Sequence, residues 1–348
     1  MSETGLTAWF ADLGLGDRPR VGGKGASLGE LTRAGIPVPT GFVVCTAAFD
    51  AFIAELEHTG PVRAVVESLE ADDLETLTRV TAGLRERVES AEFPAALRAE
   101  LLAAHARLSA DGAPVAVRSS ATTEDAEDAS FAGLQDTYLW VTDATQLLAR
   151  IRSCWASLYS VESVGYRRRR NVPEAGVSMA VVVQQMVDAR SAGVMFTRSP
   201  LTGDRSVMTI ESAWGLGSAV VGGEVTPDRW VIGKITGEIT ARDVSDKHIL
   251  HRPLAGGGTE SAETPEADRR EPSLSDEELQ NLRAIGRRIE RHYGKPQDIE
   301  WAIERGSNAL LLLQSRPETV WAAKEAVSVA TAKADPHAHV MTIFGGRR

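Results

Sequence analysis

Apolar positions in the first half of the chain follow a helical period for long stretches. A short apolar run at residues 42–45 predicts a strand, and the positions from there to about residue 109 have mostly helical spacing. Residues 145–170 place apolar side chains every three or four positions, which predicts one amphipathic helix. Ser27 and Glu30 form a capping-box pattern after a glycine-rich stretch, so we expect a helix to begin there.

The second half of the chain favours strands. Three strand-like runs follow one another and predict a mainly antiparallel lobe. A hairpin and a final pair of strands follow further along the chain. The expected strands are residues 177–187, 193–197 and 207–212, the hairpin 230–240, and the final pair 297–304 and 309–316.

A stretch without periodicity separates these two groups of strands. Residues 252–273 are rich in Gly, Pro, Glu and Ala, so we expect a long loop or linker. Ser275 and Glu278 form a capping box after it, which predicts a helix to about Tyr293.

Length and these patterns together predict an α+β protein of about two lobes. We expect a first lobe of residues 1–175 with helices and a flap loop, and a second, antiparallel lobe of residues 176–320 with a final metal-binding hairpin. Residues 321–348 form an uninformative tail.

Net charge and cysteine content predict the kind of binding partner and the cellular compartment. The net charge of -10 argues against a nucleic-acid or anionic-membrane partner and favours a small molecule or a protein. Cys45 and Cys154 lie in apolar settings typical of buried thiols, which indicates a reducing compartment. With no membrane-spanning or leader-like stretch, we expect a cytoplasmic protein.

Two basic residues lie where the chain could bind phosphate. Lys24 stands in a glycine-rich turn at an expected helix start, where backbone amides favour anions; a plain capped turn is the alternative. Arg118 ends a short strand at residues 114–118 and enters a polar, flap-like loop, where it could contact phosphate or simply pair with Glu124 or Asp125.

The final strand pair brings oxygen ligands and a cation to one face. Alternation puts Asp298 and Glu300 on one face, and on the partner strand Gln314 and Arg316 also share a face. Mg²⁺ prefers oxygen ligands, so Glu300 and Gln314 could bind it while Arg316 contacts phosphate. The alternative is an exposed sheet face with an ordinary ion pair.

Three further residues have a polar or aromatic group within an apolar pattern. Gln184 interrupts an apolar run and could hydrogen-bond an adenine edge, although the adjacent Gln185 weakens that argument. Trp155 and Tyr159 are expected in the core rather than in a site.

In this order, the segments resemble the nucleotide-binding region of phosphoenolpyruvate synthase, pyruvate phosphate dikinase and rifampin phosphotransferase. The motifs that carry the resemblance are Val-Arg-Ser-Ser-Ala-Thr at 117–122, Ala-Ser-Phe-Ala-Gly at 129–133 and Gln-Ser-Arg-Pro at 314–317. The resemblance spans nearly the whole chain and implies an ATP-grasp fold that binds ATP and Mg²⁺.

The resemblance also implies roles for individual residues. Lys24, Arg118 and Arg316 would face phosphates, and Gly133 and Thr137 would belong to a loop that closes over them. Gln184 would touch the nucleotide, Glu300 and Gln314 would bind Mg²⁺, and Glu211 would be an acidic residue of the site.

In the family that the chain resembles, ATP gives its β-phosphate to a histidine on a swivelling domain, yielding AMP and phosphate. The chain has no Thr-Ser-His-type segment, and His337 and His339 lie in its tail. We therefore expect the ATP-binding subunit of a split dikinase, similar to that of phenylphosphate synthase, which phosphorylates a histidine on a partner chain. That partner would also bind a small acceptor such as a phenol or pyruvate. The alternatives are a direct small-molecule kinase and a catalytically silent nucleotide-binding regulator.

Overall fold

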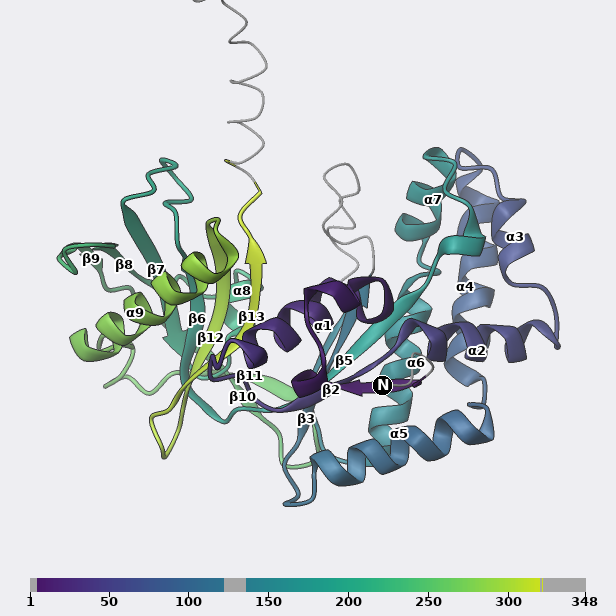
Figure 1. The fold of residues 1–348 in the computed structure, drawn as a ribbon, viewed down its shortest axis with the longest axis horizontal. Coiled ribbons are helices and arrows are strands. Elements are labelled where there is room, and N and C mark those ends of the chain that lie inside the picture. The colour runs from purple at the N-terminus through teal and green to yellow at the C-terminus, as the bar shows by residue number, and fades with distance from the viewer. Residues whose placement is uncertain (1–4, 122–135, 320, 322–348) are drawn as a thin grey trace, which may run out of the picture.

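Two large antiparallel sheets, a separate two-stranded hairpin and the surrounding helices form the described part of the chain in a computed structural model, which describes residues 5–121, 136–319 and 321. Figure 1 shows the two sheets side by side, with most helices of the first half around one sheet and α9 beside the other. This mixture of helices and sheets agrees with the predicted α+β class.

The first sheet has five strands, in the order β1-β2-β5-β3-β4. All its neighbouring strands are antiparallel. Its strands are β1 (Thr7–Trp9), β2 (Gly41–Val44), β3 (Val115–Ala121), β4 (Thr137–Val141) and β5 (Met179–Gln185).

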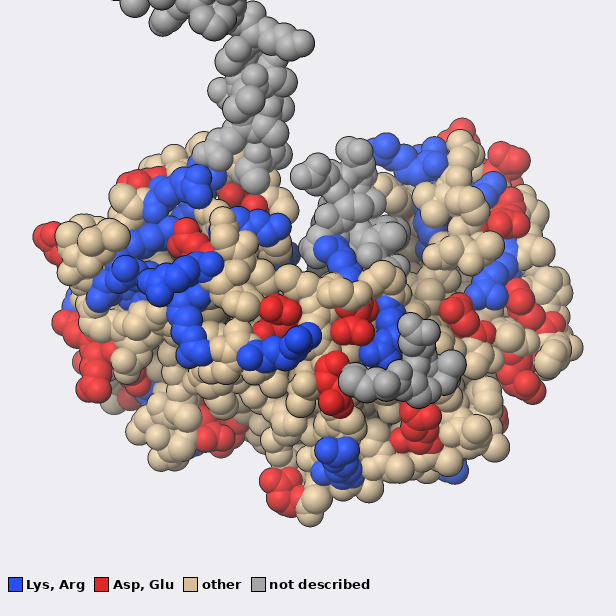
Figure 2. All heavy atoms as spheres, viewed as in Figure 1, with Lys and Arg blue, Asp and Glu red and all other residues tan. Residues whose placement is uncertain are grey.

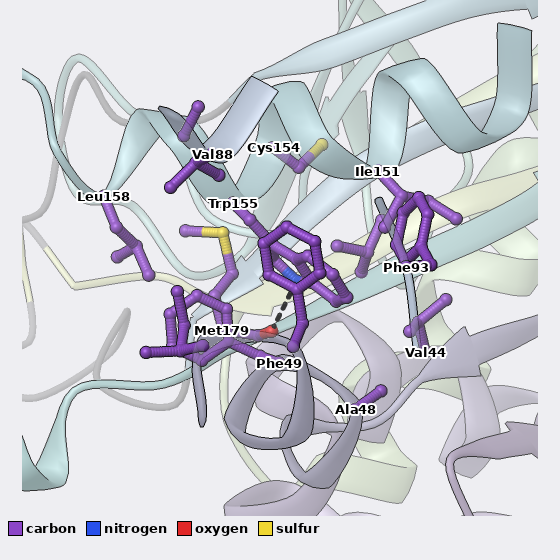
Figure 3. Close-up of a cluster of buried hydrophobic side chains, with 14 of the residues drawn as sticks. Val44, Ala48, Phe49, Val88, Phe93, Ile151, Cys154, Trp155, Leu158 and Met179 are labelled. Atoms are coloured by element: carbon purple, nitrogen blue, oxygen red, sulfur yellow. Dashed lines mark hydrogen bonds between the residues drawn. The ribbon is translucent and has the colours of Figure 1, made fainter. Parts of the chain in front are cut away.

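Helices α2 to α7 pack around this sheet and share its largest apolar core. Trp155 lies at the centre of that core with Phe49 and Phe93 against it, and its indole nitrogen donates a 3.1 Å hydrogen bond to the carbonyl of Met179 (Figure 3). Trp155 and Tyr159 are therefore core residues, as predicted. The helices are α2 (Thr46–Glu57), α3 (Arg63–Glu67), α4 (Leu74–Ser90), α5 (Ala95–Leu108), α6 (Ala144–Ser157) and α7 (Val161–Arg169).

The single helix predicted over residues 145–170 is wrong, because the structure divides it into α6 and α7. Ser160 caps α7, and its hydroxyl accepts a hydrogen bond from the Ser163 amide. Serine competes for backbone amides and so favours a cap, whereas periodicity alone does not register the interruption.

The second sheet has six strands, in the order β13-β12-β6-β7-β8-β9. The final hairpin and the hairpin before residue 240 are both present, as predicted. The strands are β6 (Ala189–Phe196), β7 (Val207–Trp214), β8 (Asp228–Gly233), β9 (Ile239–Asp243), β12 (Gln297–Glu304) and β13 (Leu310–Pro317).

Helix α9 (Asp276–Tyr293) covers this second sheet with an apolar stripe. Leu279, Leu282 and Ile289 are buried against sheet residues such as Trp230 and Trp301. The predicted capping box of Ser275 with the third helical residue is present, and Gly294 ends the helix in a left-handed conformation. Figure 2 shows Lys and Arg side chains gathered where α9 lies, although the chain as a whole is acidic.

One strand belongs to a different sheet from the one expected. The sequence groups residues 177–187 with the strands that follow, but β5 pairs with β2 and β3 of the first sheet. The reason is physical: every residue of β5 except Gln185 is buried, so the strand needs neighbours on both sides and covered faces. The crossing to the second sheet therefore comes after Gln185, not before residue 177.

The region predicted as a loop at residues 252–273 contains a short hairpin. Strands β10 (Ile249–Pro253) and β11 (Thr259–Glu263) pair with each other, so the prediction is wrong for this part. Neither strand is deeply buried, which leaves little apolar alternation for a sequence pattern to register.

Helix α1 (Arg18–Arg33) contacts both sheets, through β3 and β5 on one side and β13 on the other. Its chain direction changes at Gly22, which has a φ of 71°. The capping box predicted for Ser27 and Glu30 is wrong, because Ser27 lies inside α1 and its hydroxyl donates to the Ser315 carbonyl at 2.6 Å.

Four other short helices complete the described chain. They are α8 (Ser218–Val221) and the 3-10 helices Phe10–Asp12, Leu15–Asp17 and Glu174–Gly176. Across the parts of the chain that the structure describes, no helix combines the length and apolar character needed to cross a bilayer.

Candidate functional site

A cavity of about 320 Å³ lies between the two sheets. Its walls come from β3, β4 and β5 of the first sheet and from β6 and β12 of the second, together with α8. Most of the lining is apolar, with a few polar side chains converging on it, among them Arg118, Gln184 and Glu300. Such a combination is typical of small-molecule and cofactor sites.

Arg118 and Glu300 join the two sheets at this cavity. The Arg118 guanidinium donates to the Glu300 carboxylate at 2.7 Å and to the Leu313 carbonyl at 3.3 Å. Their side chains are 12% and 28% exposed, so the pair is partly shielded from water. The two residues proposed for phosphate and for metal therefore lie in direct contact.

Glu300 and Gln314 occupy directly opposed positions on β12 and β13. Alternation predicts only the face that each side chain takes, and the register of the two strands sets them opposite each other. The Gln314 side chain is buried, and its carbonyl oxygen Oε1 finds no hydrogen-bond partner among the described residues. A buried oxygen without a partner costs free energy, and sites that bind ligands commonly have such atoms.

Asp298 and Arg316 form the next opposed pair on the same face of these strands. Nε of Arg316 lies 3.5 Å from Oδ2 of Asp298. Burial raises the pKa of the Asp298 carboxyl above its usual range, against the opposing effect of Arg316. The Asp298 oxygen Oδ1 also has no partner within the described chain. The sequence pattern placed Asp298 on the same face as Glu300 and gave it no role. In the structure it lies beside the site, through its contact with Arg316.

Lys24 lies on α1 just after the turn at Gly22 and is only 5% exposed. That turn packs against β3, where the Ser120 hydroxyl donates to the Val21 carbonyl and accepts from the Gly25 amide. Lys24 thus faces the site from a fixed backbone rather than from a free surface loop.

A second cavity, of about 550 Å³, lies along α1 and the end of β13. Lys24, Gln314 and Arg316 line it together with Arg18 and Lys295. Gln314 lines this cavity, while Glu300, opposite it on β12, lines the first, so neighbouring residues of the β12–β13 pair line the two cavities. The predicted residues are therefore brought together, in two adjoining cavities.

The remaining predicted site residues differ in placement. Thr137, at the start of β4, lines the first cavity, and so does Gln184, whose amide donates to the Pro39 carbonyl at 3.3 Å. Glu211 shares a cross-strand row with Glu300 but lies two strands away, beyond Val194. Gly133 lies outside the described residues.

Glu211 is the member of the predicted set that the described cavities do not include. It lines neither of the two cavities, as far as the described residues go. Burial raises the pKa of its carboxyl, while Arg229 on the neighbouring strand opposes this shift. Two strand spacings, roughly 9.6 Å, separate it from Glu300.

The sequence comparison identifies the class of domain to which this chain belongs. Residues 18–337 match the family described as pyruvate phosphate dikinase, AMP/ATP-binding domain, so the chain belongs to that family.

Curated relatives carry related names. The chain is 44% identical over 316 residues to a protein of Methanothermobacter thermautotrophicus named "Probable phosphoenolpyruvate synthase", a match that covers 90% of this chain and 46% of the relative. It is 38% identical to the phosphoenolpyruvate synthase of Aeropyrum pernix, over 93% of this chain and 43% of that protein. It is 42% identical to a rifampicin phosphotransferase of a Streptomyces species, over 90% of this chain and 36% of that protein.

These matches cover less than half the length of each of those relatives. The similarity therefore concerns their AMP/ATP-binding part.

Proposed function

We propose that the cavity between the sheets binds ATP in an ATP-grasp arrangement, with the nucleotide between two lobes. The observation that carries this proposal is the contact of Arg118 with Glu300, 182 residues apart in the chain, at the wall of a mainly apolar cavity. An apolar cavity suits the purine, and the buried Gln184 lines the same space. The basic residues would then bind the phosphates.

Three cations in this region would offset the charge of the triphosphate. Arg118 lines the first cavity, and Lys24 and Arg316 line the adjoining one. Cleavage of a triphosphate spreads negative charge over its phosphoryl oxygens, so fixed cations in a partly enclosed site lower the barrier. On nucleotide binding, the Arg118 guanidinium would exchange Glu300 for phosphate oxygens. Thr137 begins strand β4 rather than lying in the predicted loop, and from the cavity wall it would lie beside these phosphates. The loop role implied for Gly133 falls outside the described residues.

The residues on β12 and β13 fit a magnesium ion. The Glu300 carboxylate and the Gln314 carbonyl oxygen, which has no hydrogen-bond partner within the described ranges, are hard oxygen donors. Mg²⁺ usually takes one or two ligands from protein and the rest from phosphates and water. When bound, Mg²⁺ would neutralise charge on the phosphate oxygens. Glu211 is the less direct acidic residue, since its row on the sheet leads to Glu300 through Val194.

We further propose that the chain is the ATP-binding subunit of a split dikinase. The relatives it matches extend well beyond the matched part, so the complete reaction of such proteins involves further regions. Here a histidine nitrogen on a separate swivelling chain would bond to the β-phosphorus of ATP and release AMP, and a water molecule would take the γ-phosphoryl group as inorganic phosphate. That partner would then phosphorylate a small hydroxyl or enol acceptor, such as a phenol or pyruvate. The two buried thiols suit a cytoplasmic setting.

Transfer of radioactive phosphorus from β-labelled ATP tests this proposal. The purified chain, Mg²⁺ and host-cell extract should yield AMP together with acid-labile, base-stable label on a second protein. A Lys24→Met variant keeps the apolar stem of this buried side chain but not its charge, so it should lose the transfer while keeping its melting temperature.

Other outcomes point to other functions. Formation of ADP without a labelled protein would indicate a direct small-molecule kinase. ATP binding without turnover, in the presence of every plausible partner, would indicate a regulatory nucleotide-binding protein. Absence of ATP binding would contradict the proposal as a whole.

A further inference from the structure

Three polar side chains form a hydrogen-bonded series at one wall of the first cavity. The Ser218 hydroxyl of α8 lies 2.8 Å from Nδ1 of His251, which belongs to β10. Nε2 of the same imidazole lies 3.2 Å from the Glu224 carboxylate. The His251 side chain is only 12% exposed, so its ring is held between these two partners. None of the roles considered above involves these three residues.

Ser218 lines the cavity at a point between its two ends. Gln184 and the chain that follows β5 line it where β6 begins, and Glu300, which Arg118 contacts, lines it where β6 reaches Val194. We take these two places as the ends of the cavity. Strand β6 runs between these ends, from Ala189 to Val194, which is opposite Glu300.

The start of α8 lies over the middle of that strand. A Cβ on Gly217 would lie 3.4 Å from that of Ala192 and 3.9 Å from the Gly193 nitrogen. Ser218 therefore borders the part of the cavity between the purine end and the phosphate end, where the sugar of a nucleotide belongs.

The hydrogen bonds determine what Ser218 can offer to a ligand. A carboxylate only accepts, so Glu224 selects the His251 tautomer that has its proton on Nε2. In the neutral imidazole with this tautomer, Nδ1 is an acceptor, and the Ser218 hydroxyl donates its only proton to it. The oxygen of Ser218 keeps its lone pairs and can only accept from a ligand. Phosphate groups, whose last pKa is about 6, are mostly deprotonated near neutral pH and so mainly accept hydrogen bonds, whereas a sugar hydroxyl always has a proton to donate.

We propose that Ser218 accepts a hydrogen bond from a ribose hydroxyl of the nucleotide, and that His251 and Glu224 are positioning residues that keep it an acceptor. This inference rests on the proposed ATP site and adds a residue that recognises the sugar. The chain would thereby distinguish ribonucleotides from nucleotides that lack the hydroxyl concerned.

Dissociation constants measured by calorimetry on the purified chain test this assignment. The probes are ATP, 2′-deoxy-ATP, 3′-deoxy-ATP and inorganic tripolyphosphate. One of the two deoxy nucleotides should bind the unmodified chain about two- to tenfold more weakly than ATP, the effect of one hydrogen bond. Ser218→Ala should weaken the binding of ATP by a similar factor. The same variant should bind that deoxy nucleotide no more weakly than it binds ATP. Tripolyphosphate, which has no sugar, should bind both chains equally.

Two further variants separate positioning from folding. His251→Phe keeps a planar ring without nitrogen atoms, so it should reduce discrimination between ATP and the deoxy nucleotide while leaving tripolyphosphate binding unchanged. His58→Gln, at a histidine with 77% of its side chain exposed, should keep full discrimination.

Equal ATP affinity in Ser218→Ala and the unmodified chain would overturn the assignment. The assignment would also be overturned if the Ser218→Ala chain still bound the deoxy nucleotide more weakly than ATP, because the two losses would then be independent. Both results leave ATP binding itself intact and so differ from failure of the proposed function, in which the unmodified chain binds no ATP.

Discussion

Buried oxygen atoms in and beside the site lower the stability of the folded chain. Asp298 and Gln314 each have a buried oxygen without a hydrogen-bond partner in the described structure, and Glu300 has only a partly exposed cation beside it. Unsatisfied buried oxygens cost about 1–3 kcal/mol each, more if charged. Such a cost is expected where a ligand or metal ion completes the contacts.

The buried carboxyl of Asp298 should make the free energy of unfolding depend on pH. Because burial raises its pKa in the folded chain above the ordinary value of 3.8, the folded state binds more protons than the unfolded state. Stability is then lost as pH rises from about 4 through the folded pKa. Asp298→Asn, which cannot ionise, should lose less stability between about pH 4 and pH 7 than the unmodified chain does in urea unfolding.

The matched control for this test is Asp243→Asn. Asp243 pairs with Arg229 on the same sheet, but its side chain is 64% exposed. Replacing it should leave the pH dependence unchanged. An Asp298→Asn chain with the same pH profile as the unmodified one would contradict the burial argument.

Among the elements, α1 depends on one glycine for its place beside both sheets. Gly22 has a φ of 71°, and a Cβ at this position would lie 2.2 Å from the Ser120 carbonyl oxygen on β3. A side chain would therefore meet both an unfavourable backbone conformation and an atom of the main chain. This close contact keeps Lys24 and its turn against the strand that carries Arg118.

Gly22→Ala should lower the free energy of unfolding by about 1–3 kcal/mol for the strained backbone conformation alone. The contact with Ser120 should add to this loss. Urea unfolding of the purified variant measures this loss. Gly83→Ala is the comparison, because Gly83 lies inside α4 and a methyl group added there would meet no atom within 4 Å. It should gain about 0.5–1 kcal/mol from helix propensity. Equal effects of the two replacements would contradict the contact.

At the scale of the whole molecule, the site exists only where two sheets with separate apolar cores meet. One core surrounds Trp155 and the other surrounds Trp230 and Trp301. The cavity takes its walls from both sheets, and Arg118 and Glu300 link them directly. A ligand in the cavity would contact both sheets at once, so its binding energy should stabilise their arrangement.

ATP at about one hundred times its dissociation constant should raise the free energy of unfolding by about 2.7 kcal/mol. Urea titrations with and without nucleotide measure this change. Arg118→Met should reduce the stabilisation by ATP at the same ATP concentration. Arg85→Met, which replaces a half-exposed side chain on α4, should leave the stabilisation unchanged. No stabilisation at any ATP concentration would count against a nucleotide site between the sheets.

The sequence by itself determined the elements whose signals are local. Strands β12 and β13 agree with their predicted ranges to within a residue, and the Ser275 box opens α9 as expected. Alternation also assigned Asp298 with Glu300, and Gln314 with Arg316, to shared faces, because side chains along a strand have a period of two. The register that sets Glu300 opposite Gln314 came from the structure. Family motifs then indicated the residues of the site.

Only the tertiary structure decided what depends on distant neighbours. The sheet to which β5 belongs, the Arg118–Glu300 contact across 182 residues, and the series from Ser218 to His251 across 33 residues have no local signal. Strand pairing and side-chain contacts of this kind are selected by how whole faces are buried. That selection is made when the sheets pack, so periodicity along the chain does not reveal it.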